Sequence, residues 1–198
     1  MPSETTIPLS PSKTYHIYGR ATGNEVLFRS DENYDFFLKL YKKYIVPLAH
    51  TYCYCLMSNH YHFLVRLKDE KELRENFPKK KETIVVSQDK LKVEKHISQQ
   101  FSNFLNSYAK AYNKHYKRMG GLFIRPFKRR LVEDEKYWIK LVHYIHSNPI
   151  SAKLVTNLKN YRFSSYPYIL QEDNTWLKTR EVLEWFGGIE SFTAYHET

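Results

Sequence analysis

Cysteine is scarce in this chain: its 198 residues include two, Cys53 and Cys55. In an extended strand, side chains two residues apart lie on the same face, which is a poor geometry for a disulfide between them. The sequence therefore offers no disulfide framework, and we expect reduced thiols and a cytoplasmic protein.

Long hydrophobic runs are also absent. No stretch approaches the roughly 18 consecutive apolar residues that mark a membrane-spanning helix, so we expect no membrane partner. Residues 1–13 are polar and proline-rich, and they lack the apolar segment of a secretory signal. We expect them to form a flexible leader and the protein not to be exported.

Acidic residues are outnumbered, 21 Asp and Glu against 31 Lys and Arg, which gives a formal net charge of +10. Aromatic side chains are abundant instead, at 16% of the chain, including 17 tyrosines. A basic surface rich in aromatics is typical of proteins that grip phosphate backbones and stack bases. The alternatives are a basic surface that only keeps the protein in solution, and one that meets anionic lipid.

Hydrophobic periodicity predicts four strands alternating with helices. The predicted strands cover residues 14–21, 51–57, 61–67 and 122–132, the last interrupted by Pro126. The predicted helices begin near residues 31, 94 and 133 and end at Pro47, Gly120-Gly121 and Asn148-Pro149, and a short helix follows near 179–186.

This order predicts an α+β fold of the ferredoxin-like or RRM-like kind, a split β-α-β-β-α-β arrangement. We expect an antiparallel sheet with helices on one face, which leaves the other face open for a ligand. The core domain would span residues 14–150 and include a charged, partly mobile connector at 68–95. Residues 151–198 would form a C-terminal extension packed on the core.

His60 and His62 lie at the join of the predicted hairpin. Two residues apart on a strand, they share a face, while Tyr61 points the other way. Imidazole is the commonest metal-binding side chain, so this pair can hold one ion. The alternative is a pair of half-buried histidines that only make local hydrogen bonds.

Tyr144 and Asn148 are four residues apart on the last core helix, so both project from the same side. A phenol could act as a nucleophile there, and an amide oxygen as a metal ligand. His143 and His146 lie nearby and compete for the ligand role. Spacing alone does not single out Tyr144 from a packed surface aromatic.

A run of basic residues without any acid lies between Lys110 and Arg130. Such a run is usually a solvated face, but here aromatics flank it, which favours nucleic-acid contact. The eight candidates are Lys110, Lys114, Lys117, Arg118, Arg125, Lys128, Arg129 and Arg130.

Three ordered motifs resemble those of the HUH single-tyrosine transposases, and most closely their REP-associated branch. They are the stretches 54–65 (Tyr-Cys-Leu-Met-Ser-Asn-His-Tyr-His-Phe-Leu-Val), 144–150 (Tyr-Ile-His-Ser-Asn-Pro-Ile) and 163–166 (Phe-Ser-Ser-Tyr). Gly121-Leu122-Phe123 and the stretch 127–130 also fit the pattern. The resemblance runs from about residue 15 to 168. The chain departs from the pattern at Tyr61, where the family has a hydrophobic residue, and at Phe163, where it has tryptophan.

The resemblance implies a metal-assisted enzyme that nicks and rejoins single-stranded DNA beside hairpins. It assigns Tyr144 as the nucleophile and His60, His62 and Asn148 as ligands of Mg²⁺ or Mn²⁺. Such a protein would be nucleoid-associated and either a monomer or a homodimer. The alternatives are a protein of the same ancestry that binds DNA hairpins or RNA without cutting, and an unrelated His-based metal hydrolase, for which the sequence supplies no general base.

Overall fold

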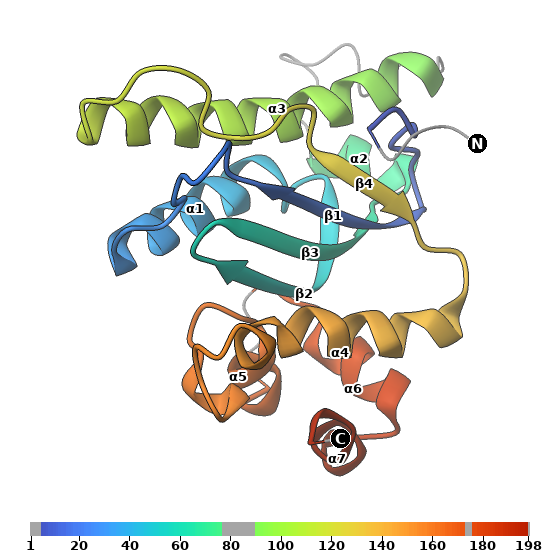
Figure 1. The fold of residues 1–198 in the computed structure, drawn as a ribbon. Helices are drawn as coiled ribbons and strands as arrows, with labels where there is room; N and C mark the ends of the chain where they lie inside the picture. Colours follow the sequence, from blue (N-terminus) through green and yellow to red (C-terminus); the bar gives the residue numbers. More distant parts are fainter. Residues whose placement is uncertain (1–4, 77–89, 173–175, 198) are drawn as a thin grey trace.

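The structure is a computed structural model that describes residues 5–76, 90–172 and 176–197 (Figure 1). Within these ranges, four strands form one antiparallel sheet with the order β2-β3-β1-β4. The strands are β1 (Thr14–Arg20), β2 (Ala49–Met57), β3 (His60–Leu67) and β4 (Lys128–Leu131). The helices are α1 (Asp31–Tyr44), α2 (Glu70–Asn76), α3 (Lys90–His115), α4 (Glu135–Ser151), a 3₁₀ turn (Leu158–Asn160), α5 (Tyr166–Leu170), α6 (Thr179–Phe186) and α7 (Ile189–His196).

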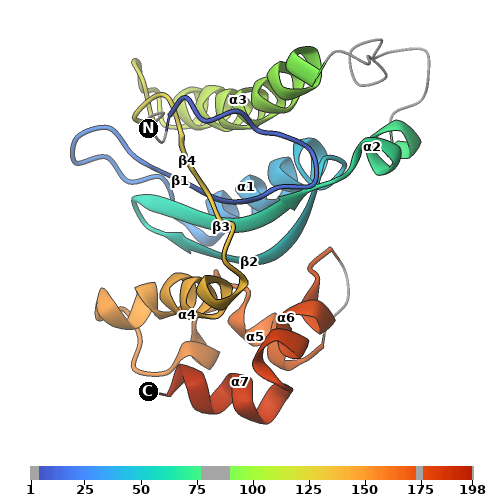
Figure 2. The same cartoon turned by 90° about the vertical axis from the view of Figure 1, so that its right-hand side faces the viewer.

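Helices cover both faces of the sheet, and our expectation of helices on one face was wrong. Figure 2 shows α1 and α3 on one side of the sheet and α4 to α7 on the other. The reason lies in β2: Tyr54 and Leu56 pack with the first layer, while Cys53, Cys55 and Met57 pack with the second. A strand that is apolar on both faces must be covered on both faces.

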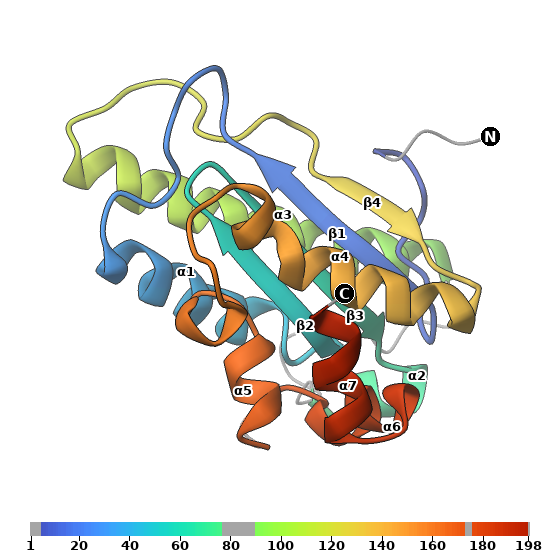
Figure 3. The same cartoon turned by 60° about the horizontal axis from the view of Figure 1, so that its bottom comes forward.

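The histidine side chains of β1 and β3 lie on the face of the sheet that carries α4. In β1 and β3, the residues Tyr15, Ile17, Tyr61 and Phe63 belong to the core beneath α1 and α3. Because strand side chains alternate, the residues between them face α4. Those residues include His16, Tyr18 and His62. Figure 3 shows α4 crossing this side of the sheet.

Several element boundaries differ from the sequence prediction. The last strand is shorter than predicted, because within 122–132 only Lys128–Leu131 pairs with β1 and only an isolated bridge joins Phe123 to Ala21. Part of the charged connector forms α2, whereas its segment 77–89, with the three lysines at 79–81, lies outside the described residues. No helix in the described ranges has the length and apolarity that crossing a membrane would require.

Helix α4 also continues past the point where we expected it to end, because it includes Pro149 and runs to Ser151. Proline has no backbone N–H, so the carbonyl of Ile145 lacks its usual partner four residues on. The Asn148 side chain supplies the missing donor: its Nδ2 donates to the carbonyls of Tyr144 at 2.8 Å and Ile145 at 3.2 Å. This contact satisfies the Ile145 carbonyl that Pro149 leaves without a backbone donor.

Gly19 leaves room for the Tyr61 side chain at the site end of the sheet. A Cβ built on Gly19 would lie 2.6 Å from the Tyr61 hydroxyl oxygen, and Tyr61 is fully buried. We therefore expect Gly19→Ala to lower the free energy of unfolding by about 1–3 kcal/mol through overpacking. Urea denaturation measures this. Gly121→Ala is the control, because a Cβ there would lie 4.0 Å from its nearest neighbour, the Phe123 carbonyl oxygen. Equal midpoints for both variants would contradict the prediction.

A chain of buried histidines attaches α7 to α4. The Nδ1 of His196 donates to the Phe192 carbonyl at 2.8 Å, and its Nε2 accepts from the Nδ1 of His146 at 3.0 Å. The Nε2 of His146 lies 2.7 Å from the Ser165 hydroxyl, which also accepts from the backbone N–H of Tyr54. When both rings are neutral, each ring N–H faces an acceptor and each ring lone pair faces a donor. A proton added to the Nε2 of His196 would therefore face the N–H of His146.

Burial lowers the pKa of His196 to about 4, so the folded protein holds this ring neutral. The unfolded ring has a pKa near 6.5 and binds a proton as the pH falls below that value. Stability is therefore retained above about pH 6.5 and lost toward pH 4. We expect the titration of His196 alone to make the free energy of unfolding about 2 kcal/mol lower at pH 5 than at pH 7.5. Urea unfolding at both pH values measures the loss, and His196→Gln should show a smaller one; an unchanged pH dependence would contradict the assignment.

Candidate active site

The four residues expected to form a site lie together in the folded protein. His60 begins β3 and His62 follows on the same face, while Tyr144 and Asn148 lie one turn apart on α4. The Nε2 of His60 is 3.5 Å from the Oδ1 of Asn148. The rings of His62 and Tyr144 meet edge to face with centroids 5.7 Å apart. The Tyr144 side chain is 52% exposed, so its phenol is accessible rather than buried in the core.

His60, His62 and Tyr144 line a cavity of about 500 Å³ between the sheet, α4 and the loop before β4, and Asn148 adjoins it through His60. Its walls combine polar and cationic groups with an apolar patch. The lining residues are Tyr18, Gly19, Arg20, Asn59, His60, His62, Ile124, Pro126, Lys128 and Tyr144. A cavity of this size has room for more than a phosphate group.

The hydrogen bonds of His60 determine which of its nitrogens faces Asn148. Its Nδ1 is 2.7 Å from the Oδ1 of Asn59, an oxygen that only accepts, so Nδ1 carries the proton. Burial lowers the pKa of His60, which keeps the ring neutral at neutral pH. The Nε2 of His60 is then an acceptor with a free lone pair.

The Asn148 amide is oriented by the proline-bearing turn described above. Its Nδ2 is engaged by the α4 carbonyls, so its Oδ1 faces the sheet and His60. Two acceptor atoms thus face each other at 3.5 Å without a proton between them. A cation between them would satisfy both, so the donor set fits a divalent metal ion.

The surroundings of His62 also favour its neutral form, and they lower its pKa strongly. Burial, followed by the neighbouring imidazoles of His16 and His60, lowers its pKa to about 3. Two neutral imidazoles and an amide oxygen would carry no charge to a metal. Among the described residues, no three His, Cys, Asp or Glu side chains converge as a metal site.

The two rival histidines of α4 do not line this cavity. His146 is fully buried and takes part in the chain with Ser165 and His196. His143 contacts the hydroxyl of Ser147 at 3.2 Å and packs against the ring of Tyr195. Helical geometry explains the separation, because these positions are turned away from the side that carries Tyr144 and Asn148.

His16 and Arg20 are among the residues near the site that the sequence analysis missed. His16 in β1 lies with its Nε2 2.9 Å from the Nδ1 of His62. Arg20, at the end of β1, is the cross-strand partner of His60, lines the cavity and is exposed. The available signal was the alternation His16-x-Tyr18 in the first strand, which repeats the spacing of the His60-x-His62 pair. Alternation alone does not show that the two strands are neighbours.

The basic residues expected to bind DNA separate into surface and buried groups. Lys128 and Arg130 are exposed on the α4 side of β4, and Lys128 also lines the cavity. Lys110, Lys114 and Lys117 are exposed along the end of α3 and just after it, and Arg125 is exposed with a contact to Asn106.

Arg129 lies on the opposite face of β4 and is 9% exposed. Its guanidinium donates to the Ser98 hydroxyl at 2.9 Å and to the Thr5 carbonyl at 2.7 Å. Because strand side chains alternate, one arginine of the pair 129–130 must point inward. We therefore withdraw Arg129 from the candidate DNA contacts.

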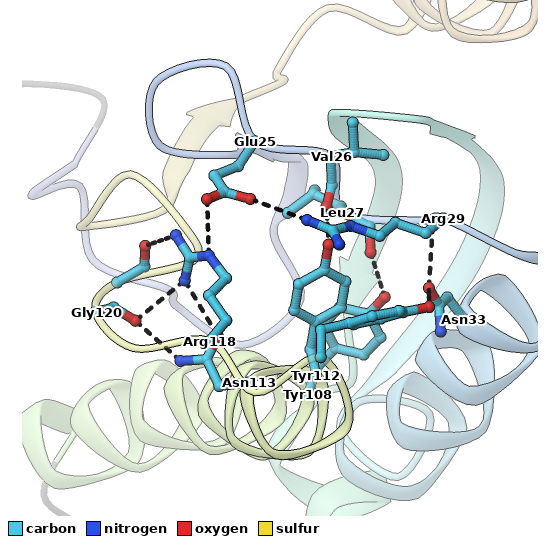
Figure 4. Close-up of polar contacts among 12 residues, drawn as sticks. Glu25, Val26, Leu27, Arg29, Asn33, Tyr108, Tyr112, Asn113, Arg118 and Gly120 are labelled. Atoms are coloured by element: carbon cyan, nitrogen blue, oxygen red, sulfur yellow. Dashed lines mark hydrogen bonds and ion pairs between the residues drawn. The ribbon is translucent and has the colours of Figure 1, made fainter.

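Arg118 stabilises the turn that follows α3 (Figure 4). Its Nε donates to the Glu25 carboxylate at 2.8 Å, and its other N–H groups donate to Asn113 and to the carbonyls of Gly120 and Gly121. A phosphate would have to displace these contacts and an opposite charge. Arg118 is therefore also withdrawn from the candidate DNA contacts.

Comparison with known proteins supports the fold. The chain matches no protein-family model, and no curated protein matches it in sequence. Among solved structures it is similar to a REP-associated tyrosine transposase bound to a REP hairpin, with a TM-score of 0.53 and 11% sequence identity. The match covers 86% of each chain. At this identity the likeness concerns the fold alone.

Proposed function

We propose that this protein cleaves and rejoins single-stranded DNA beside a hairpin, through a covalent link between DNA and Tyr144. The observation that carries the proposal is the placement of an accessible phenol and two imidazoles in one cavity, with the Asn148 amide oxygen facing one of those imidazoles. The similarity to a transposase that is bound to a DNA hairpin supports the same class of substrate. Oligomeric state, monomer or homodimer, stays a prediction.

In the proposed reaction the Tyr144 oxygen attacks a backbone phosphorus and loses its proton. A bond forms between the phenol oxygen and phosphorus, and the bond from phosphorus to the 3′-oxygen breaks. The products are a 5′-phosphotyrosine link and a strand with a free 3′-hydroxyl. A second 3′-hydroxyl can then attack the link and restore the phenol, so rejoining needs no nucleotide cofactor.

His60, His62 and Asn148 are the residues that would hold a divalent ion, Mg²⁺ or Mn²⁺. When bound, such an ion supplies Lewis-acid stabilisation of negative charge on the phosphate oxygens. Three neutral ligands leave its charge available for this. Arg20 and Lys128 border the same cavity and offer cations for the phosphates on either side.

The proposed DNA path uses the exposed basic residues only. It comprises Lys110, Lys114, Lys117, Arg125, Lys128 and Arg130. Neutralising about six phosphates would make the affinity fall about 10³-fold between 50 and 200 mM salt.

The neighbours Arg129 and Arg130 provide a matched test of this path. Both substitutions to glutamine remove one positive charge, but only Arg130 is exposed. We expect Arg130→Gln to weaken binding of a single strand several-fold and to reduce the slope of log affinity against log salt by about one. We expect Arg129→Gln to lower stability and to leave that slope unchanged. Fluorescence anisotropy at several salt concentrations measures both, and equal slopes for the two variants would contradict the proposed path.

The function itself is tested by incubating the protein with Mn²⁺ and labelled single strands that carry hairpins. The expected result is a protein–DNA adduct that survives denaturing electrophoresis and a second product with a free 3′-hydroxyl. If these strands bind but no adduct forms on any of them, the protein is a nucleic-acid binding protein that does not cut.

A further inference from the structure

His16, a residue outside the sequence motifs, makes a direct contact with one of the candidate metal ligands. Its Nε2 lies 2.9 Å from the Nδ1 of His62. Both side chains are buried, at 7% and 6% exposure, so water does not compete freely for this hydrogen bond. The two rings lie nearly parallel, with centroids 5.1 Å apart and planes 20° apart.

The strand register explains why these two rings meet. Tyr18 is directly opposite His62, and His16 is opposite Leu64, so His16 and His62 are diagonal neighbours on one face. Diagonal pairs on adjacent strands are within reach of aromatic side chains. The ring of Tyr18 stacks on both imidazoles, and Tyr144 meets both edge to face. These contacts restrict rotation of the His62 ring.

The hydrogen bond also bears on which nitrogen of His62 carries the proton. When His16 accepts at Nε2, His62 donates from Nδ1, and the lone pair of His62 is at Nε2. When His16 donates instead, the Nε2 of His62 carries the proton and has no lone pair for a metal. The protonation pattern of His16 therefore determines whether His62 can act as a ligand through Nε2.

His60 has an equivalent partner in Asn59, whose Oδ1 fixes the proton on Nδ1 of His60. Histidine ligands generally donate their second ring N–H to a partner that sets the tautomer and the ring orientation, and loss of such a partner costs about 10–100-fold in metal affinity. Carboxylates and carbonyls are the usual partners. Here a second imidazole takes that place.

We propose that His16 is a positioning residue that holds His62 in the tautomer and orientation required to bind the divalent ion. This inference rests on the proposed function, because it assigns His62 as a ligand. It also gives a role in the site to a residue of β1, a strand that lies outside the paired-histidine motif of β3.

The test compares three variants by Mn²⁺ binding without DNA, measured by the loss of the free Mn²⁺ signal in electron paramagnetic resonance. His16→Leu cannot accept a hydrogen bond, and we expect it to bind Mn²⁺ about 10–100-fold more weakly. His16→Gln offers an acceptor oxygen, and we expect it to bind within about threefold of the wild type. His50→Gln is the matched control, because His50 is a sheet histidine at the other end of the hairpin, bonded to Glu72; it should bind like the wild type.

The same variants separate a positioning role from a structural one in the cleavage assay. For His16→Leu we expect the adduct rate to fall at limiting Mn²⁺ and to recover at saturating Mn²⁺, with unchanged DNA affinity in the absence of metal. Equal Mn²⁺ affinity of His16→Leu and the wild type would overturn the inference. Equal losses in His16→Leu and His16→Gln would also overturn it, because packing rather than the hydrogen bond would then be responsible.

A measurement on the unaltered protein covers the case in which His16→Leu does not fold. Long-range ¹H–¹⁵N correlation spectra with Mg²⁺ should show His62 protonated at Nδ1 and not at Nε2. Protonation at Nε2 would overturn the inference. If the wild type forms adducts but His16 has no effect, the inference alone falls; if the wild type neither binds Mn²⁺ nor forms an adduct, the proposed function falls with it.

Discussion

Tyr144→Phe is expected to abolish the covalent protein–DNA adduct while leaving the fold and DNA binding intact. The substitution removes one hydroxyl group, and that oxygen is the proposed nucleophile. Loss of the nucleophile in enzymes that use covalent catalysis lowers the rate by several orders of magnitude. We therefore expect the rate of adduct formation to fall at least about 10³-fold, to near the detection limit of the assay. The ring stays in place, so its edge-to-face contacts with His16 and His62 are retained.

Tyr18→Phe is the matched control for this experiment. Tyr18 lines the same cavity and its ring also contacts His62, but it lies on β1 rather than α4. We expect Tyr18→Phe to form the adduct at a rate within about tenfold of the wild type, because it keeps the nucleophile. If the adduct persisted in Tyr144→Phe and disappeared in Tyr18→Phe, our proposal would have assigned the wrong tyrosine as the nucleophile.

His60→Ala is expected to abolish cleavage with little effect on DNA affinity. The imidazole of His60 presents a lone pair toward the Oδ1 of Asn148. Alanine at this position would remove one of the proposed metal ligands. We expect the adduct rate to fall at least about 100-fold because metal binding is lost. Affinity for a single strand, measured without metal, should change by no more than a few-fold, since the proposed phosphate contacts are the exposed basic residues.

His143→Ala serves as the control for the metal site. His143 lies on α4 immediately before Tyr144 but bonds to Ser147 and packs toward α7. We expect this variant to cleave like the wild type. A large loss in His143→Ala combined with normal cleavage in His60→Ala would show that the metal ligands were assigned to the wrong histidines. Parallel loss of cleavage and of stability in His60→Ala would indicate a structural role for that imidazole.

The two withdrawn arginines show how the fold changes the interpretation of a charge run. Eight basic residues without an acid between them look alike in the sequence. In the structure, Arg129 is buried against Ser98 and Thr5, and Arg118 is neutralised by Glu25. The acid that pairs with Arg118 is 93 residues away, so no local pattern could have indicated it.

The sequence by itself determined which side chains share a face of one element. The period of a strand places His60 and His62 together, and the period of a helix places Tyr144 and Asn148 one turn apart. Both pairs follow from local backbone geometry, and the structure has each pair on one side of its element. The resemblance of these stretches to known motifs then suggested that the two pairs belong to one site.

Only the tertiary structure decided how these faces meet. Strand order brought His16 beside His62, and the packing of α4 onto the doubly apolar strand β2 brought Asn148 to His60. Where α4 continues through Pro149, the Asn148 side chain bonds to the carbonyls of Tyr144 and Ile145, and this contact orients its amide. Periodicity determines which residues lie on a face, whereas packing and strand register determine what that face contacts, because those depend on residues far apart in the chain.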